Sequence, residues 1–284
     1  MKFSKKRQKW AQNRQSILKG QPLNYNAALE SKYSVSIKKL VQQMTRETKT
    51  EIMKLFKSPV AKEYFAQDES IGSQARILMN KLTSKFSELF GYKSSMLAKT
   101  MVINAGKSSA TTLHRSLKQL SGGISLKTSI ITPELEDVSK ALIAENVSLI
   151  KSIPEQYFKE ITGSVMRSIS AGGLFDLEPE IQKYEGITSR RAHLIALDQT
   201  RKAYTMINKV RLDELGVTHF EWMHTGGSAH PRESHLNIDG MTFSFANLIA
   251  EQKAAGVPEK DQGLPAYAPY CRCRMLPVYK LGED

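Results

Sequence analysis

The spacing of apolar residues changes near residue 216, and this change constrains the fold more than any other feature of the sequence. From about residue 26 onward, apolar side chains recur at intervals of three and four, the period of an amphipathic helix. After Gly216 the period falls to two, which places Phe220 and Trp222 on one face of a predicted strand over residues 217–224. Long helices followed by a few short strands predict an α+β fold with a small antiparallel sheet, not a parallel α/β fold.

Glycine and proline indicate where the helices should end. The helix with the clearest apolar stripe is expected from Ser189 to Leu215, with Gln199 as the one polar interruption of that stripe. Thr132-Pro133 predicts a helix start, because threonine caps and proline suits the first turn. Breaks are expected at Ser58-Pro59, Gly72, Gly91, residues 121–123, residues 171–173 and Gly186.

The last quarter of the chain is expected to hold the sheet. A polar loop over 225–237 should lead into a hairpin with a short strand at 241–243, and a final strand is expected at 274–279. The chain as a whole divides into a basic N-terminal arm (1–20), a helical region (21–145) and a C-terminal domain (146–284). No run of eighteen apolar residues occurs and no apolar signal segment follows the basic start, so neither a membrane span nor secretion is expected.

The net charge of +13 is concentrated in the first half of the chain. Residues 1–20 carry seven cations and no acid, whereas residues 185–284 carry twelve of each. Such a basic arm indicates a polyanionic partner, most often nucleic acid, and the expected ligand is double-stranded DNA bound without sequence preference. For residues 21–140 a lysine-rich surface that only keeps the chain soluble explains the charge equally well. The predicted DNA-binding residues are Lys2, Lys5, Lys6, Arg7, Lys9, Arg14 and Lys19.

Two cysteines and a group of histidines form a candidate zinc site in the last quarter. Residues i and i+2 of an extended segment point to the same side, so Cys271 and Cys273 can converge on one ion. His235 is the expected third ligand. His230 is the expected fourth ligand, and His224 is the alternative for that position. Two thiols alone cannot form the disulfide framework of a secreted protein.

The two cysteines and the histidines have other possible interpretations. The two thiols can pack as reduced, small apolar side chains or form a strained local disulfide, and the histidines can simply bond loop backbone. A metal-dependent nuclease or toxin-like enzyme would pair the histidines with a carboxylate, and Glu233 and Asp239 are near His235 in sequence. The chain has no P-loop, nucleophile elbow or H-E-x-x-H motif, so we expect no enzymatic activity.

Several stretches, in order, carry a resemblance to a known family. They are residues 146–154, the helical run 191–202 with Asn208, Arg211 and Gly216, then Trp222, the block 230–235 with Asp239-Gly240, and Cys271-Arg272-Cys273. In this order they resemble the phage Mu F-like minor head proteins, also called phage head morphogenesis proteins. The sequence departs from many members at 197–200, which read Leu-Asp-Gln-Thr, and at Ser228 and His230, which bear on the fourth metal ligand.

The resemblance implies a structural virion protein of a tailed phage. Such a protein joins the portal vertex during head assembly in the host cytoplasm and lies inside the head near packaged DNA. Its expected partners are the portal protein and the DNA, with the major capsid or scaffolding protein as further candidates. Its expected role is in head assembly and genome delivery.

Overall fold

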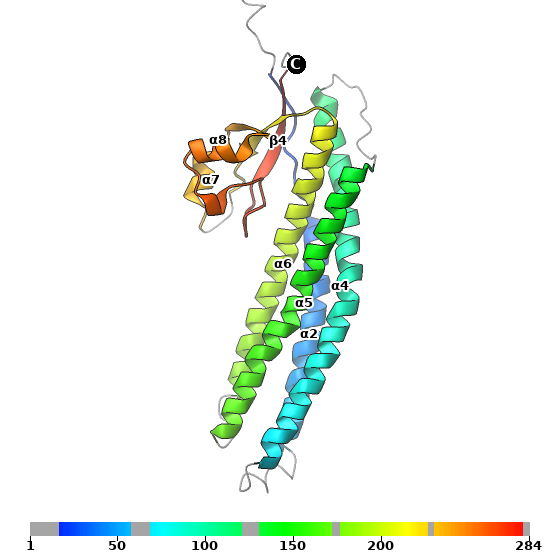
Figure 1. Ribbon diagram of the computed structural model, residues 1–284, viewed down its shortest axis with the longest axis vertical. Coiled ribbons are helices and arrows are strands. Elements are labelled where there is room, and N and C mark those ends of the chain that lie inside the picture. Colours follow the sequence, from blue (N-terminus) through cyan, green and yellow to red (C-terminus); the bar gives the residue numbers. More distant parts are fainter. Residues whose placement is uncertain (1–16, 58–68, 121–130, 172–176, 227–229, 281–284) are drawn as a thin grey trace, which may run out of the picture. The chain divides into compact units, whose positions relative to one another are not determined.

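The computed structural model describes residues 17–57, 69–120, 131–171, 177–226 and 230–280 (Figure 1). Four long helices and a small four-stranded antiparallel sheet confirm the α+β prediction. The long helices are α2 (Ala27–Lys57), α4 (Glu69–Leu120), α5 (Pro133–Ser170) and α6 (Leu177–Glu214). The strands are β1 (Ile17–Lys19), β2 (His219–Met223), β3 (Thr242–Ser244) and β4 (Arg274–Lys280).

The helices run through three glycines at which breaks were expected. Gly72 and Gly91 lie inside α4, and Gly186 lies inside α6, so these predicted breaks are wrong. A glycine costs a helix about 1 kcal/mol relative to alanine. Tertiary packing offsets that cost: Phe86 and Phe90, beside Gly91, are completely buried. The predicted breaks at 58–59, 121–123 and 172–173 lie outside the described residues.

The chain forms two compact units, each built from separate segments. The first unit takes its described residues from within 1–25, 105–138 and 201–284, and the second from 26–104 and 139–200. The expected boundary at residue 146 falls inside α5. The division into an arm, a helical region and a C-terminal domain stays a prediction.

A buried chain of polar side chains links three helices within the second unit. The Tyr33 hydroxyl of α2 donates to Asn146 Oδ1 of α5 at 3.0 Å, and Asn146 Nδ2 donates to Gln199 Oε1 of α6 at 2.9 Å. Gln199 Nε2 in turn donates to Glu145 Oε1 at 3.2 Å. Buried amides are costly unless their hydrogen bonds are made, so this chain selects one alignment of the helices. Gln199, the expected interruption of the α6 stripe, is therefore a helix-to-helix contact.

The sheet has the strand order β1-β4-β2-β3, with each neighbouring pair antiparallel. The β2–β3 hairpin and the C-terminal strand confirm the predictions for residues 217–224, 241–243 and 274–279. Strand β1 was not expected, because residues 17–19 belong to the predicted basic arm. Ile17 pairs with Lys280, and Lys19 Nζ contacts the carboxylate of Glu221 on β2.

Three short helical segments connect the strands and position the candidate site. They are α7 (Glu233–Asn237), α8 (Leu248–Ala254) and a 3-10 turn over Glu259–Asp261. The prediction of a loop over 225–237 is wrong at its end, where α7 begins. One buried cluster joins the sheet to residues of α4 and α6. Its members on the strands include Phe220, Trp222, Phe243 and Met275.

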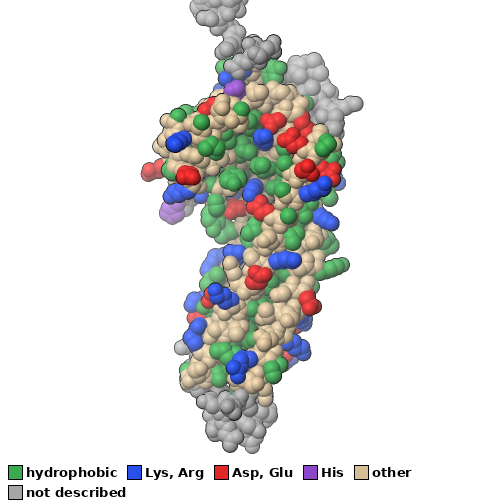
Figure 2. Space-filling view, in the orientation of Figure 1, with side chains coloured by type: hydrophobic (Ala, Val, Ile, Leu, Met, Phe, Trp, Pro, Cys, Tyr) green, Lys and Arg blue, Asp and Glu red, His purple; other side chains and the backbone are tan. Residues whose placement is uncertain are grey.

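No helix of the described residues is long and apolar enough to cross a membrane. On the face shown in Figure 2, lysine, arginine and acidic side chains are interspersed with apolar ones over the helices.

Candidate metal centre

Three of the four predicted metal ligands come together in the first unit. The ligand atoms of His235, Cys271 and Cys273 all lie within 4.8 Å of one another, and each residue is only 3% exposed. Helix α7 supplies the histidine, and the extended segment just before β4 supplies both thiols. The i, i+2 spacing of the cysteines therefore places both sulfurs on one side of the chain, as the sequence predicts.

The distances suit a tetrahedral soft-metal site. His235 Nδ1 lies 3.6 Å from Cys271 Sγ and 3.7 Å from Cys273 Sγ. A zinc ion about 2.3 Å from sulfur and about 2.0 Å from nitrogen sets N···S separations of about 3.5 Å at the tetrahedral angle. Both N···S distances therefore lie close to those of a zinc site.

The second nitrogen of His235 is held by the 3-10 turn. His235 Nε2 lies 3.0 Å from the carbonyl oxygen of Asp261, so the proton is assigned to Nε2 and the lone pair of Nδ1 faces the sulfurs. The Asp261 carboxylate accepts hydrogen bonds from Arg232 Nε at 2.9 Å and Ser234 Oγ at 3.0 Å. Asp261 and Arg232 thus orient a ligand, a role that no pattern in the sequence indicates, because 26 residues separate Asp261 from His235.

Burial and mutual contact shift the pKa values of the cluster. The Cys273 thiol donates to Cys271 and lowers the pKa of Cys271, while burial opposes that change. The same contact, together with burial, raises the pKa of Cys273. Burial lowers the pKa of His235, but its contacts with Cys271 and the Asp261 carbonyl outweigh that effect and leave the pKa raised. The contact between the two thiols thus favours the thiolate at Cys271 over the thiolate at Cys273.

Backbone and aromatic groups complete the surroundings of the sulfurs. The Ala266 N–H donates to Cys271 Sγ at 3.3 Å, and the Tyr25 hydroxyl donates to the carbonyl oxygen of Cys273. The Trp222 ring stands edge-on to His235 with centroids 4.9 Å apart. These contacts fix the ligands before any ion binds.

The remaining candidate residues lie outside this cluster. His230 is exposed, and among the described residues the three-membered group does not include it. The backbone N–H of His224 donates to Asp239 Oδ1 at 2.7 Å, and its Nδ1 accepts from the Gly226 N–H. Glu233 and Asp239, the acids that a nuclease would need, are both exposed and outside the cluster as well.

Residues 159–276 match the family model for phage Mu protein F like proteins. This segment is phage Mu F-like. The match lies within residues 146–284, where the sequence shows the resemblance, and it contains His235, Cys271 and Cys273.

One curated relative also matches. It is an uncharacterized protein of Haemophilus influenzae, 27% identical over 271 residues. The alignment covers 94% of this chain but only 57% of the relative, so the chain spans little more than half of that protein. No solved structure matches the chain.

Two residues that carry the resemblance have a structural role within the first unit. Arg211 of the Mu F-like segment is buried, and its guanidinium donates to the Gly106 carbonyl at 2.7 Å and to Ser109 Oγ at 2.8 Å on α4. Ser109 Oγ donates to Asn208 Oδ1 at 2.8 Å. Burial lowers the pKa of Arg211. Asn208 and Arg211 thus anchor α6 to α4 and take no part in the metal centre.

All seven predicted DNA-binding residues precede the Mu F-like segment. Six of them lie outside the described residues. These are Lys2, Lys5, Lys6, Arg7, Lys9 and Arg14. Lys19 is described: it lies on β1, half-exposed, beside Glu221.

Proposed function

We propose that this chain is a structural minor head protein of a tailed phage. It binds the portal vertex inside the capsid, contacts packaged DNA and acts in head assembly and genome delivery. The observation that carries the proposal is the Mu F-like match over residues 159–276. The major capsid and scaffolding proteins are further candidate partners.

The metal centre supports a structural role and not a catalytic one. His235, Cys271 and Cys273 are each 3% exposed, so a substrate has no open path to them in this structure. A catalytic zinc needs an accessible coordination position, whereas a structural zinc is enclosed by its ligands. We therefore propose a zinc ion that these three residues hold for stability, with His230 as the candidate for the fourth position.

The charge distribution supports the DNA contact. Seven cations and no acid occupy residues 1–20, whereas the last hundred residues are neutral. Phosphate contacts of lysine and arginine dominate non-specific DNA affinity. The basic arm is thus the proposed DNA contact, and the neutral Mu F-like segment is the proposed contact with other head proteins.

Co-purification with phage particles tests the proposed function. Mature heads banded on a density gradient should contain this chain at a low, fixed ratio to the portal protein, measured by quantitative mass spectrometry. Heads lacking the portal should lose it, whereas heads lacking an unrelated minor protein should retain it. Absence of the chain from heads, together with chelator-sensitive nuclease activity that requires His235, would instead support a metal-dependent enzyme.

Removing residues 1–16 should flatten the salt dependence of DNA binding. This truncation deletes six cations but keeps β1, whose loss would damage the sheet. Each phosphate contact adds about 0.9 to the slope of log affinity against log salt, so the slope should fall by as much as about 5. Fluorescence anisotropy with a random-sequence duplex measures it.

A full-length variant with those six cations replaced by glutamine controls for chain length and should behave like the truncation. Equal slopes for all three proteins would show that the arm is not the DNA contact. Acidic surfaces of the portal or capsid would then be the better partners of the arm.

A further inference from the structure

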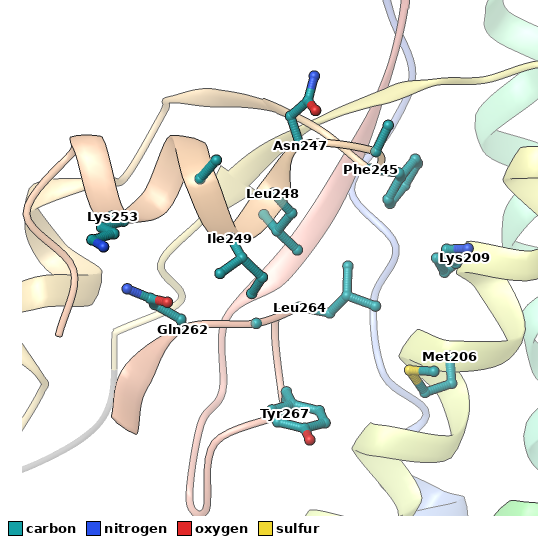
Figure 3. Close-up of a pocket in the computed structure, with 13 residues that line it drawn as sticks. Met206, Lys209, Phe245, Asn247, Leu248, Ile249, Lys253, Gln262, Leu264 and Tyr267 are labelled. Atoms are coloured by element: carbon teal, nitrogen blue, oxygen red, sulfur yellow. The ribbon is translucent and has the colours of Figure 1, made fainter. Parts of the chain in front are cut away.

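A mostly apolar groove lies on the first unit, separate from the metal ligands. It has a volume of about 700 Å³ and is bounded by α6, by the segment from Phe245 through α8, and by residues 262–267 (Figure 3). Ile249 and Tyr267 remain 53% and 56% exposed there. Its apolar lining is formed mainly by Met206, Phe245, Leu248, Ile249, Leu264 and Tyr267.

The charged groups at the groove are all cationic. Lys209 of α6 and Lys253 of α8 come from opposite walls, and none of the residues that line the groove is acidic. Lys202 Nζ lies 5.1 Å from the centre of the Tyr267 ring. Lys209 also pairs with Asp213, one turn farther along α6, at 2.5 Å. The groove therefore suits apolar side chains that are accompanied by carboxylates.

Hydrogen bonds hold the groove open before any partner binds. The buried Gln252 side chain makes two bonds to Gly263: its Nε2 donates to the carbonyl oxygen at 3.0 Å, and its Oε1 accepts from the N–H at 2.8 Å. Gly263 is required at that point, since its φ is +129° and a Cβ there would lie 2.9 Å from the Tyr267 ring.

The same loop is fixed at both ends by the metal centre. The Asp261 carbonyl contacts His235, and the Ala266 N–H donates to Cys271 Sγ. A preformed wall avoids part of the ordering cost of binding.

We propose that this groove docks an acidic amphipathic segment of the portal protein, a partner whose identity rests on the function proposed above. Opposite charge favours such a segment over the chain's own arm, which has seven cations and no acid in residues 1–20. The apolar lining favours it over DNA, whose phosphates cannot fill an apolar surface. Apolar anchors at helical spacing enter the groove, and an adjacent carboxylate meets Lys253.

Calorimetric titration of the full chain tests the proposal, with intact portal protein and overlapping 20-residue portal peptides as probes. The peptides that bind should be acidic, with apolar residues at three- and four-residue spacing. Ile249→Ser and Lys253→Glu should each weaken binding by about tenfold or more. Matched controls outside the groove are Ile103→Ser, at an isoleucine that is 56% exposed on α4, and Lys260→Glu, and both should bind as the parent chain does.

Three results would overturn the proposal. The first is equal portal binding by the groove and control variants. The second is selection of basic peptides. The third is self-association of the chain that Ile249→Ser abolishes, which would make a second copy the occupant. A chain that sediments with heads while its groove variants bind the portal normally would keep the proposed function and lose the groove.

Discussion

Purified protein should contain about one zinc ion per chain, and removing that ion should destabilise the first unit strongly. An ion that binds only the folded state adds about 4 kcal/mol when its free concentration is a thousand times its Kd. The ligands here are buried and already oriented, which favours binding of the ion to the folded state. Cys273→Ser should therefore lose both the zinc and the stability.

Elemental analysis and thermal unfolding with and without a chelator measure this effect. A chelator should lower the Tm of the parent chain but leave the Tm of Cys273→Ser unchanged, because that variant has no ion to lose. His230→Ala and His224→Ala distinguish the fourth ligand, since only the variant that removes a ligand should lose zinc. Metal-free protein whose Tm equals that of the zinc-loaded form would rule out the structural zinc.

Trp222→Ala should cost about 3–5 kcal/mol of stability, the usual range for removing a large buried aromatic side chain. Trp222 is completely buried, and its ring stands edge-on to both His235 and Phe243. Its removal opens a cavity beside a metal ligand as well as in the sheet core. Urea unfolding monitored by circular dichroism measures the change in the free energy of unfolding.

Tyr267→Ala is the matched control, because that aromatic ring is more than half exposed and its removal should cost little. Combining Trp222→Ala with Cys273→Ser tests whether the ring supports the metal centre. The double variant should lose less than the sum of the two single losses if Trp222 holds His235 in place. If Trp222→Ala lowers the free energy of unfolding only slightly, the core around Trp222 tolerates a cavity.

The sequence predicts the helices, the hairpin and the convergence of three ligands because each depends on local periodicity or short spacing. Phe220 and Trp222 reveal β2 by alternation, and Cys271 and Cys273 share a side because they are two residues apart. The continuous helices were missed because one glycine ends a helix only where packing does not compensate. Gly91, next to the completely buried Phe90, is such a compensated position.

Features that depend on distant pairing could not be predicted in the same way. Asp261 orients His235 through a backbone carbonyl, a group that every residue carries. The chain of Tyr33, Asn146 and Gln199 forms only after three helices have packed. Strand β1 is three residues long and has no alternation to detect, so only its partner β4 defines it.

The pairing of β1 with β4 also determines the order in which the protein can fold. Ile17 and Lys280 are separated by almost the whole described chain. On the ribosome, residues 17–19 are made long before residues 274–280 and must wait until that partner strand has been synthesised. Contacts between such distant residues form slowly, because a long loop must close before they gain any stability. Completion of the sheet is therefore a late event, and until then one edge of β4 is open to pairing with another chain.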